Sequence, residues 1–501
     1  MKYLMGIDNG GTFCKAAVFD EDGNQIASSS FPTITLTPKP GYTERDMNEL
    51  WESNARAILT CITKSGIDRR DLAGVSFSGH GKGLYLVGDN HEPAYHGILS
   101  TDNRAWEYVK KWYEDGTCHK VYQKTFQEIL VCQPVSILAW LKDKEPEVLQ
   151  KTKYIFHVKD YIRFCLTGEA YAEYTDSTGS NLVNLSTSSY DVELLSFLGL
   201  DNIMDKLPKL RRSNEICGYV TKKAALKTGL PEGIPVAAGM FDIDACGIAA
   251  GLSDENKMCM IAGTWSINEF LSRKPITDGS VALNSMYCIP GYYLVEESSP
   301  TSAGNMEWFI RNLMDKEEKY YQKPIYDIAN EWVASINPQE SNVIFLPFLN
   351  GSNTAPLAKG TFVGLTAYHT KKHMLRAVYE GIVFSHLTHI NKLLKNHPIP
   401  ESIRLAGGVT KSEVWVQMFA DVLQIPIDVI EDKEIGAQGA AMAAGIAAGL
   451  YRDYEEAIRR TVKITKQVKP RREYKEVYEE KYSTYSQIID GLSSCWKRFK
   501  N

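Results

Sequence analysis

The first hundred residues alternate between short apolar runs and polar turns. Residues 3–7 are apolar, a polar Gly-rich turn follows at 8–12, and residues 14–19 are apolar again. Short apolar runs bounded by Gly and Asp predict β-strands joined by a tight turn. A helix is predicted to begin near Asp46, because Glu49 stands at capping-box spacing and apolar residues then recur at helical period.

A similar opening recurs about half the chain later. Residues 258–262 are apolar, 263–266 form a small polar turn, and 267–271 continue as a predicted strand. This likeness predicts two related halves that each begin with a Gly-Thr turn of the size of a phosphate group. A chance likeness between two short turns is the alternative interpretation.

The second half then alternates between predicted strands and helices, which is typical of an α/β fold. Strands are predicted at 402–406 and 426–430, helices at 413–423 and 436–450, and a long terminal helix from Arg471. We expect two large α/β domains, at 1–250 and 251–501.

Composition and charge remove several classes of protein. The chain has 501 residues with 44% hydrophobic and 23% charged residues, which is ordinary globular usage. Its net charge of −5 leaves no basic excess for nucleic acid. The Ala/Gly-rich run at 439–450 is shorter than the ~20 apolar residues of a membrane span. Ten scattered cysteines without CxxC or zinc spacing predict reduced thiols and a cytoplasmic location.

The turn between the first two predicted strands has the composition of a phosphate-binding loop. Backbone N–H groups at Gly10 and Gly11 can surround phosphate oxygens, Thr12 adds a hydroxyl, and Lys15 adds a positive charge. Asp8 can hold Mg²⁺, because this hard cation takes carboxylate oxygens. A plain hairpin turn has a similar composition, and the second turn at Gly263 and Thr264 favours the phosphate interpretation.

Two further segments carry candidate chemistry. Asp242 and Asp244 follow a short buried strand and compete for two roles, a general base and a helix cap, which spacing does not separate. The Gly-rich loop at 78–83 matches neither a P-loop nor the dinucleotide fingerprint, and it suits a hydroxylated ligand. Neither histidine pair, 369/373 nor 386/389, has the pattern of a metalloprotease helix, so packing histidines are expected.

Taken together, the motifs resemble the FGGY family of carbohydrate kinases over essentially the full length. The matching segments, in order, are Asp8–Lys15, Gly41–Trp51, Gly239–Asp242, Gly263–Thr264 and Leu405–Asp421. Within the family the chain is similar to the L-xylulose kinases, including those that act on 3-keto-L-gulonate. This likeness is carried by the segments Gly81–Leu84, Leu99–Ala105 and Pro300–Phe309.

The resemblance implies two actin-like (ribonuclease H-like) ATPase domains with a cleft between them, the first binding sugar and the second ATP. It implies that Asp242 takes the proton from the attacking sugar hydroxyl. The implied contacts to ATP and Mg²⁺ are Asp8, Gly10, Gly11, Thr12, Lys15, Gly263, Thr264, Gly304, Gly407 and Gly408. The implied sugar contacts are His80, Lys82, Asp102 and Asp242.

Two departures bear on the sugar. D-Xylulose kinases typically carry Met-His where Gly81 and Lys82 stand, and Trp265 replaces a small Ser in the second phosphate loop. We therefore expect an L-xylulose or related keto-sugar kinase. The alternatives are a D-xylulose or polyol kinase of the same family, or a non-catalytic ATPase of the actin fold. A small-molecule sugar is the expected partner, a homodimer is possible, and neither nucleic acid nor membrane is expected.

Overall fold

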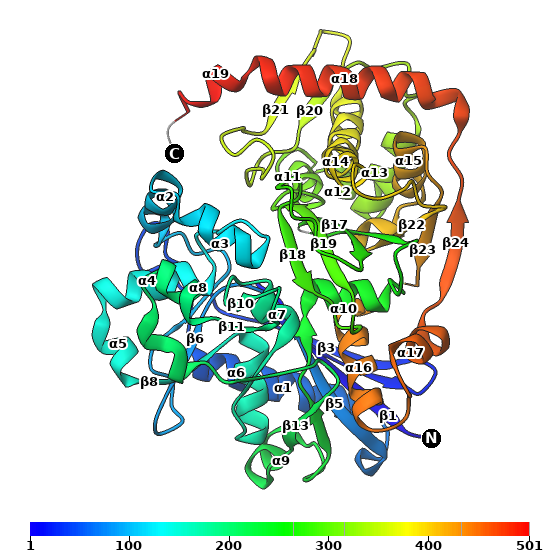
Figure 1. The fold of residues 1–501 in the computed structure, drawn as a ribbon. Helices are drawn as coiled ribbons and strands as arrows, with labels where there is room; N and C mark the ends of the chain where they lie inside the picture. Colours follow the sequence, from blue (N-terminus) through cyan, green and yellow to red (C-terminus); the bar gives the residue numbers. More distant parts are fainter. Residues whose placement is uncertain (264, 315, 432, 500–501) are drawn as a thin grey trace. The chain divides into compact units, whose positions relative to one another are not determined.

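The computed structural model describes residues 1–263, 265–314, 316–431 and 433–499. Within these ranges the chain forms two large mixed β-sheets with helices packed against them (Figure 1). The first sheet has the strand order β13-β14-β5-β1-β2-β3, and β15 also pairs with β5. Its strands are β1 (Tyr3–Asn9), β2 (Phe13–Asp20), β3 (Gln25–Pro32), β5 (Leu72–Gly79), β13 (Ile216–Tyr219), β14 (Pro235–Ala237) and β15 (Met240–Phe241).

The predicted strand–turn–strand unit is confirmed as an antiparallel pair. Strand β1 runs antiparallel to β2, with Asp8 opposite Lys15, and parallel to β5, with Asp8 opposite Ser78. The predicted helix is α1 (Met47–Ser65), and the Asp46 side chain accepts hydrogen bonds from the backbone N–H groups of Asn48 and Glu49.

The second sheet repeats the core of the first. Its order is β18-β19-β17-β16-β22-β23-β24, with β16 antiparallel to β17 and parallel to β22, and β22 parallel to β23. The first sheet has the same relations between β1, β2, β5 and β14. The predicted likeness of the two halves is therefore present in their strand pairing. The strands are β16 (Met258–Ala262), β17 (Ser266–Ser272), β18 (Leu283–Met286), β19 (Tyr293–Ser299), β22 (Ile403–Ala406), β23 (Ile427–Ile430) and β24 (Ile464–Val468).

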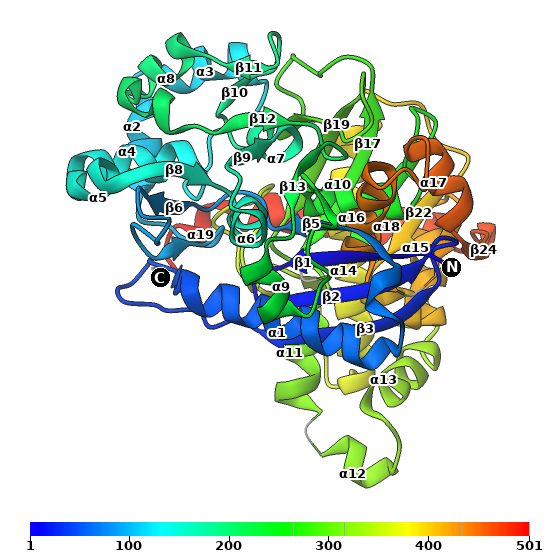
Figure 2. The same cartoon turned by 90° about the horizontal axis from the view of Figure 1, so that it is seen from below.

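The Ala/Gly-rich run near the end of the chain forms α16 (Ile435–Ala447), which packs directly on β1 and β5 (Figure 2). A Cβ at Gly6 would lie 1.7 Å from the Ala437 carbonyl oxygen, and a Cβ at Gly439 would lie 2.1 Å from that of Ala245. Because strand residues alternate between faces, Met5 and Ile7 point the other way and join the core that includes α1. Small residues thus let α16 approach the sheet and α10 (Asp242–Ala249) closely.

The chain divides into two compact units. Unit 1 comprises Met1–Ser253, Leu271–Val295 and Lys433–Val462, and unit 2 comprises Asp254–Phe270, Glu296–Asp432 and Lys463–Asn501. Each unit is therefore discontinuous in sequence, whereas the predicted domains at 1–250 and 251–501 are contiguous. Across the described residues, no helix is both long and apolar enough to cross a membrane.

The other elements complete the two units. The other helices of unit 1 are α2 (Trp106–Glu114), α3 (Thr117–Thr125), α4 (Pro134–Lys144), α5 (Pro146–Lys151), α6 (Val158–Thr167), α7 (Tyr174–Thr178), α8 (Val192–Phe197), α9 (Lys222–Thr228) and α17 (Tyr454–Thr461). Those of unit 2 are α11 (Gly304–Leu313), α12 (Glu317–Tyr321), α13 (Ile325–Ala334), α14 (Lys371–Leu393), α15 (Glu413–Leu423), α18 (Lys475–Gly491) and α19 (Ser493–Trp496). Short strands pair as β4 (Glu44–Arg45) with β7 (Gly97–Ile98), β6 (Tyr85–Gly88) with β8 (Thr152–Phe156), β9 (Tyr171–Glu173) with β12 (Lys209–Arg211), β10 (Val183–Asn184) with β11 (Ser189–Tyr190), and β20 (Ile344–Leu346) with β21 (Thr361–Val363).

Candidate active site

Three parallel strands of unit 1 end side by side and bring the predicted residues together. In the last paired row, Asn9 of β1 and Phe241 of β15 both pair with Gly79 of β5. The residues that follow this row are Gly10, His80 and Asp242. The carboxyl edge of a parallel sheet is where α/β proteins commonly bind ligands. The first phosphate turn, the Gly-rich loop and the candidate base therefore meet at one edge.

Asp242 and Asp244 differ in exposure, which the sequence alone does not show. Asp242 is the first residue of α10 and is half-buried, whereas Asp244 is fully buried. The Asp244 Oδ1 atom accepts a hydrogen bond of 3.2 Å from the backbone N–H of Cys288. A base must come within hydrogen-bond reach of the hydroxyl that it deprotonates. Neither side chain caps α10, because the N-cap residue is Phe241 and no side-chain hydrogen bond caps the helix, and the greater exposure makes Asp242 the better candidate for the base.

Asp8 lies where the first turn meets α16. Its Oδ1 atom accepts a 2.8 Å hydrogen bond from Ser78 Oγ, and a Cβ at Gly436 would lie 3.0–3.2 Å from the Asp8 carboxyl group. Burial raises the pKa of Asp8, although the Ser78 hydrogen bond and the Lys15 charge act in the opposite direction. The positive end of the α16 dipole also favours a carboxylate at this place.

Lys15 is paired within the protein. Its Nζ atom lies 2.8 Å from Glu434 Oε2, in the residue that precedes α16. Burial lowers the pKa of Lys15, but the Glu434 hydrogen bond and charge outweigh it, so the pKa is raised overall. Glu434 was not among the predicted site residues, because its partner lies 419 positions away in the sequence.

The turn itself is held from behind by Arg45, which the sequence reasoning missed. The Gly10 N–H donates to Phe13 O at 3.0 Å, and Arg45 Nη2 donates to Gly11 O at 2.6 Å. The Arg45 side chain is fully buried, whereas Gly11 and Thr12 are exposed. Since the Gly10 N–H is already bonded, the exposed N–H groups of Gly11 and Thr12 suit a phosphate best. Arg45 lies within the matched segment Gly41–Trp51, which was the available signal.

The loop after β5 packs onto the residue before Asp242. A Cβ at Gly81 would lie 2.2 Å from the Phe241 ring, and Lys82 Nζ lies 6.0 Å from the centroid of that ring. Lys82 has a left-handed backbone, with φ of 66°. His80 is buried, its Nε2 atom lies 3.1 Å from Tyr85 Oη, and burial lowers its pKa to about 3. His80 is therefore a neutral hydrogen-bonding group at pH 7.

Asp102 forms a buried ion pair with Arg104. Its Oδ1 atom accepts from Arg104 N and Nε, both at 2.9 Å, and its Oδ2 atom accepts from Thr43 N at 2.7 Å and Arg104 Nη2 at 2.9 Å. A carboxylate offers about four acceptor positions. A sugar hydroxyl that contacts Asp102 must therefore share an oxygen that already accepts two bonds, so its predicted sugar contact remains a prediction.

Unit 2 places its predicted glycines at the corresponding strand ends. Ile261 of β16 pairs with Ala406 of β22, so Gly263 and Gly407 follow neighbouring strands. Gly407 has φ of 100°, and a Cβ there would lie 2.6 Å from Ala262 O, so this position requires glycine. At Gly263 and Gly408 an added Cβ would meet no atom within 4 Å. Thr264 lies outside the described residues.

The start of α11 adjoins this turn. The N–H of Ala303 donates to Gly263 O at 3.0 Å, and Gly304 begins the helix. Gly304 also lines a pocket of about 390 Å³ together with Glu307, Trp308, Ile310, Arg311, Tyr326, Leu349 and Asn350. Open backbone next to a pocket can admit a nucleotide.

The two histidines of α14 behind this turn are buried and hydrogen-bonded. His386 contacts Ser302 Oγ at 3.1 Å and Asn268 Oδ1 at 2.8 Å. His389 contacts Ser299 Oγ at 2.9 Å and Glu297 Oε2 at 3.2 Å. They are packing histidines, as expected. Across the part of the chain that the structure describes, no group of three or more His, Cys, Asp or Glu residues could hold a metal ion.

Comparison with known proteins identifies the class. Residues 3–248 match the N-terminal domain of the FGGY family of carbohydrate kinases, and residues 258–448 match its C-terminal domain. The chain therefore belongs to the FGGY family of carbohydrate kinases. It is an ATP-dependent sugar kinase with the two-domain actin-like fold that its sequence predicts.

Particular relatives cover the whole chain. It is 37% identical to the L-xylulose/3-keto-L-gulonate kinase of Escherichia coli over 100% of this chain and 99% of that protein. It is 38% identical to a probable L-xylulose kinase of Pasteurella multocida, over 99% of this chain and 100% of that protein. The structure of a ligand-bound xylulose kinase from Lactobacillus acidophilus superposes with a TM-score of 0.90, at 25% identity, and each chain is covered completely.

Proposed function

We propose that this kinase phosphorylates L-xylulose or a closely related keto-sugar such as 3-keto-L-gulonate, with Asp242 as the general base. The observation that carries the proposal is the half-buried Asp242 at the end of β15, in the row that also brings Gly10 and His80 to the edge of the sheet. The relatives with 36–38% identity over essentially the full length are described as an L-xylulose/3-keto-L-gulonate kinase and as probable L-xylulose kinases, which supports the choice of sugar.

In the proposed site the sugar lies against the 80–83 loop and Asp242. The Nε2 atom of neutral His80 lies 3.1 Å from Tyr85 Oη and its Nδ1 atom 3.3 Å from Gly81 O, so a sugar hydroxyl that contacts His80 must share or replace one of these bonds. Lys82 supplies a positive charge beside Phe241. A fixed cation suits a sugar acid as well as a hydroxyl-rich ketose. Asp102 binds the Thr43 backbone and forms an ion pair with Arg104. It is the remaining member of the proposed set of sugar contacts.

The proposed nucleotide contacts come from both halves. In the first half they are the turn backbone at Gly10 and Gly11, the Thr12 backbone and hydroxyl, and the positive charge of Lys15, which Glu434 holds beside the turn. In the second half they are Gly263, Thr264, Gly304, Gly407 and Gly408. In this proposal the domain at 251–501 binds mainly ATP and the domain at 1–250 binds mainly the sugar.

Asp8 is the proposed ligand for Mg²⁺. Mg²⁺ keeps several waters and is commonly held by one or two carboxylates together with phosphate oxygens, so a single carboxylate beside a phosphate turn fits it. The Asp8 Oδ1 atom already accepts from Ser78, which fixes the orientation of the carboxyl group. When bound, Mg²⁺ offsets negative charge on the phosphate oxygens. The cytoplasmic location and the homodimer stay predictions.

The reaction follows from these placements. Asp242 accepts the proton of the sugar hydroxyl while that oxygen attacks the γ-phosphorus, and the bond from phosphorus to the oxygen of ADP breaks. Phosphoryl transfer depends mainly on positioning and charge stabilisation. The backbone N–H groups of the Gly11–Thr12 turn stabilise the transferred group, and Lys15 with Glu434 holds the turn on α16.

Replacing Asp242 tests the proposal. Asp242→Asn should lower kcat for sugar phosphorylation by roughly 10²–10⁴-fold, because general-base catalysis contributes about this factor. ATP binding, measured by calorimetry, should remain. Asp89→Asn is a control, since the Asp89 side chain is 88% exposed. Retention of a third of the wild-type kcat by Asp242→Asn would remove Asp242 from the role.

A substrate panel distinguishes the alternatives. L-Xylulose, 3-keto-L-gulonate, D-xylulose and several polyols are compared by kcat/KM in an ATP-coupled assay. Preference for D-xylulose or a polyol would contradict the proposed substrate but leave the kinase chemistry in place. ATP turnover that responds to no sugar would favour the non-catalytic ATPase.

A further inference from the structure

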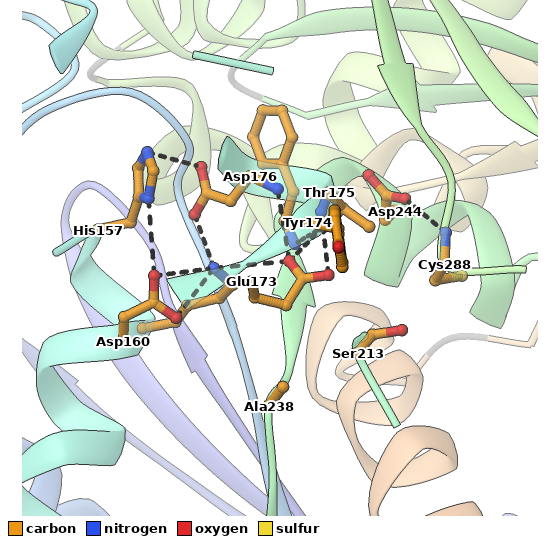
Figure 3. A network of polar contacts seen from close by, with 12 residues as sticks. His157, Asp160, Glu173, Tyr174, Thr175, Asp176, Ser213, Ala238, Asp244 and Cys288 are labelled. Carbon is orange, nitrogen blue, oxygen red and sulfur yellow. Dashed lines mark hydrogen bonds and ion pairs between the residues drawn. The ribbon is translucent and has the colours of Figure 1, made fainter. Parts of the chain in front are cut away.

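Unit 1 contains a cluster of charged side chains that is buried completely behind the candidate active site (Figure 3). We call it the buried charge cluster, and its members are His157, Lys159, Asp160, Arg163, Glu173 and Asp176. Each of them is at most 3% exposed. Lys159 Nζ lies 3.0 Å from Asp176 Oδ2, and Arg163 Nη1 lies 2.8 Å from Asp160 Oδ1. Buried ion pairs add little net stability over apolar packing, so stability alone does not explain the cluster.

The cluster makes two hydrogen-bonded links to the segment that leads into Asp242. Arg163 Nη1 donates to the carbonyl oxygen of Ala238. The second link passes through Thr175, whose Oγ1 atom donates to Glu173 Oε2 at 2.7 Å and accepts from the Phe241 N–H at 2.9 Å. Both links end within four residues of Asp242.

The direction of the Thr175 hydroxyl follows from its chemistry. A threonine hydroxyl has a single hydrogen, and the ionised form of Glu173 accepts a hydrogen bond from it. A lone pair of the Thr175 Oγ1 atom therefore accepts from the N–H of Phe241, the residue immediately before Asp242. Glu173 also accepts from the Thr175 N–H at 2.9 Å, so its carboxyl group binds both the backbone and the hydroxyl of this threonine.

The cluster also contacts β5, the strand that ends immediately before His80. A Cβ at Gly79 would lie 2.7 Å from Val158 Cγ1 and 3.3 Å from Lys159 Cβ, so the start of α6 lies directly on the end of β5. Gly239 is similarly tight, because a Cβ there would lie 2.3 Å from Phe77 O. The end of β5 therefore contacts both the start of α6 and the segment that leads into β15.

We propose that the buried charge cluster positions Asp242 for catalysis, with Thr175 as the positioning residue that transmits its geometry to the base. The proposal rests on the proposed function of Asp242. Directional hydrogen bonds between fully buried groups allow one arrangement, whereas apolar side chains would fill the space without fixing the Phe241 N–H. A small misplacement of a catalytic group costs large factors in rate, so a link of this kind bears on kcat.

The test compares two threonines of α7. Thr175→Val removes the hydroxyl that anchors Phe241 and nearly preserves the side-chain volume. Thr178→Val is the matched control, because Thr178 is equally buried and its Oγ1 atom accepts from the N–H of Met286 instead. Thr175→Ser restores the hydroxyl. Steady-state kinetics and the melting temperature are measured for the three variants and the wild type.

We expect Thr175→Val to lower kcat at least 10-fold with the KM for ATP within 2-fold of wild type. Thr178→Val should lose stability to a similar extent but keep kcat within 2-fold, and Thr175→Ser should recover most of kcat. Equal kcat values for the two valine variants, or no recovery by Thr175→Ser, would overturn the proposal. If Thr175→Val does not fold, Thr175→Ala and Thr178→Ala are compared by the same criteria.

Asp242→Asn separates this proposal from the function on which it rests. If Asp242→Asn is inactive while Thr175→Val is fully active, Asp242 is the base and the positioning proposal fails. If Asp242→Asn keeps its activity, the proposed function itself fails, whatever Thr175→Val does.

Discussion

The effect of burial on the Glu173 carboxyl group can be measured as a pH-dependent change in the free energy of unfolding. This carboxyl group is fully buried on β9, and burial raises its pKa from 4.5 to about 7, although the Lys159 charge and the Thr175 hydrogen bonds act in the opposite direction. Glu173→Gln keeps the shape of the side chain and cannot ionise. The substitution therefore isolates the cost of a buried charge at this position.

The sign of the pH dependence follows from proton binding in the two states. Between pH 4.5 and about 7 the folded protein holds a proton on Glu173 that the unfolded chain has released. The free energy of unfolding of the wild type therefore loses this contribution as the pH rises through that range, and the loss is complete above pH 7. At 1.36 kcal/mol for each unit of pKa, the total is about 3 kcal/mol. Because glutamine does not ionise, the free energy of unfolding of Glu173→Gln does not change with pH through this position.

The assay is urea unfolding at pH 5, 6, 7 and 8, followed by circular dichroism. The free energy of unfolding of Glu173→Gln, minus that of the wild type, should increase by about 2.5 kcal/mol between pH 5 and pH 8, because part of the total is already lost at pH 5. Glu114→Gln is the control, because the Glu114 side chain is 67% exposed and its pair with Lys110 contributes little. A difference between Glu173→Gln and wild type that stays constant with pH, or that decreases, would refute the reasoning.

Two substitutions examine the ligand-binding surfaces. Gly408→Asp should raise the KM for ATP at least 10-fold and leave the KM for sugar within 2-fold. Gly408→Ala is the control and should have KM values near those of the wild type, since an added Cβ meets no protein atom within 4 Å. A change in the KM for sugar alone would mean that the two halves have the opposite ligands. Lys82→Ala should lower kcat/KM at least 10-fold for 3-keto-L-gulonate and less than 3-fold for L-xylulose, because an unpaired buried carboxylate is costly. Equal losses for the two substrates would contradict a contact between Lys82 and the carboxylate.

Local pattern was sufficient for the elements that carry the site. The apolar runs at 3–7 and 258–262 are strands, and the cap at Asp46 begins α1, because each signal lies within a few residues of its consequence. Two to three residues separate Gly10, His80 and Asp242 from the ends of apolar runs, which likewise indicated that these residues lie near strand ends. What the pattern could not supply is that β1, β5 and β15 are neighbours in register, since this depends on pairing between distant segments.

The residues that the sequence did not reveal act through distant partners. Glu434 pairs with Lys15 across 419 positions, and Thr175 meets Phe241 across 66. The choice between Asp242 and Asp244 was open for the same reason, because the difference in burial arises only when the Cys288 segment packs beside α10. The run at 439–450 indicated a helix, but not that its small residues allow close contact with β1.

The two halves share their strand pairing but differ in what lies behind their candidate site residues. Behind the turn of unit 2 the support is a network around His386, whose pKa burial lowers to about 3, so that histidine is uncharged. Behind Asp242 lie the buried ion pairs of Lys159 with Asp176 and of Arg163 with Asp160. A nucleotide held by backbone N–H groups tolerates small displacements, because several weak contacts share the binding. A single base must meet a single hydroxyl, which demands the stiffer, directional arrangement. Unit 2 has buried ion pairs of its own, at Arg376, Glu380 and Lys481, but in unit 1 the buried charge cluster is hydrogen-bonded to the segment that leads into the proposed base.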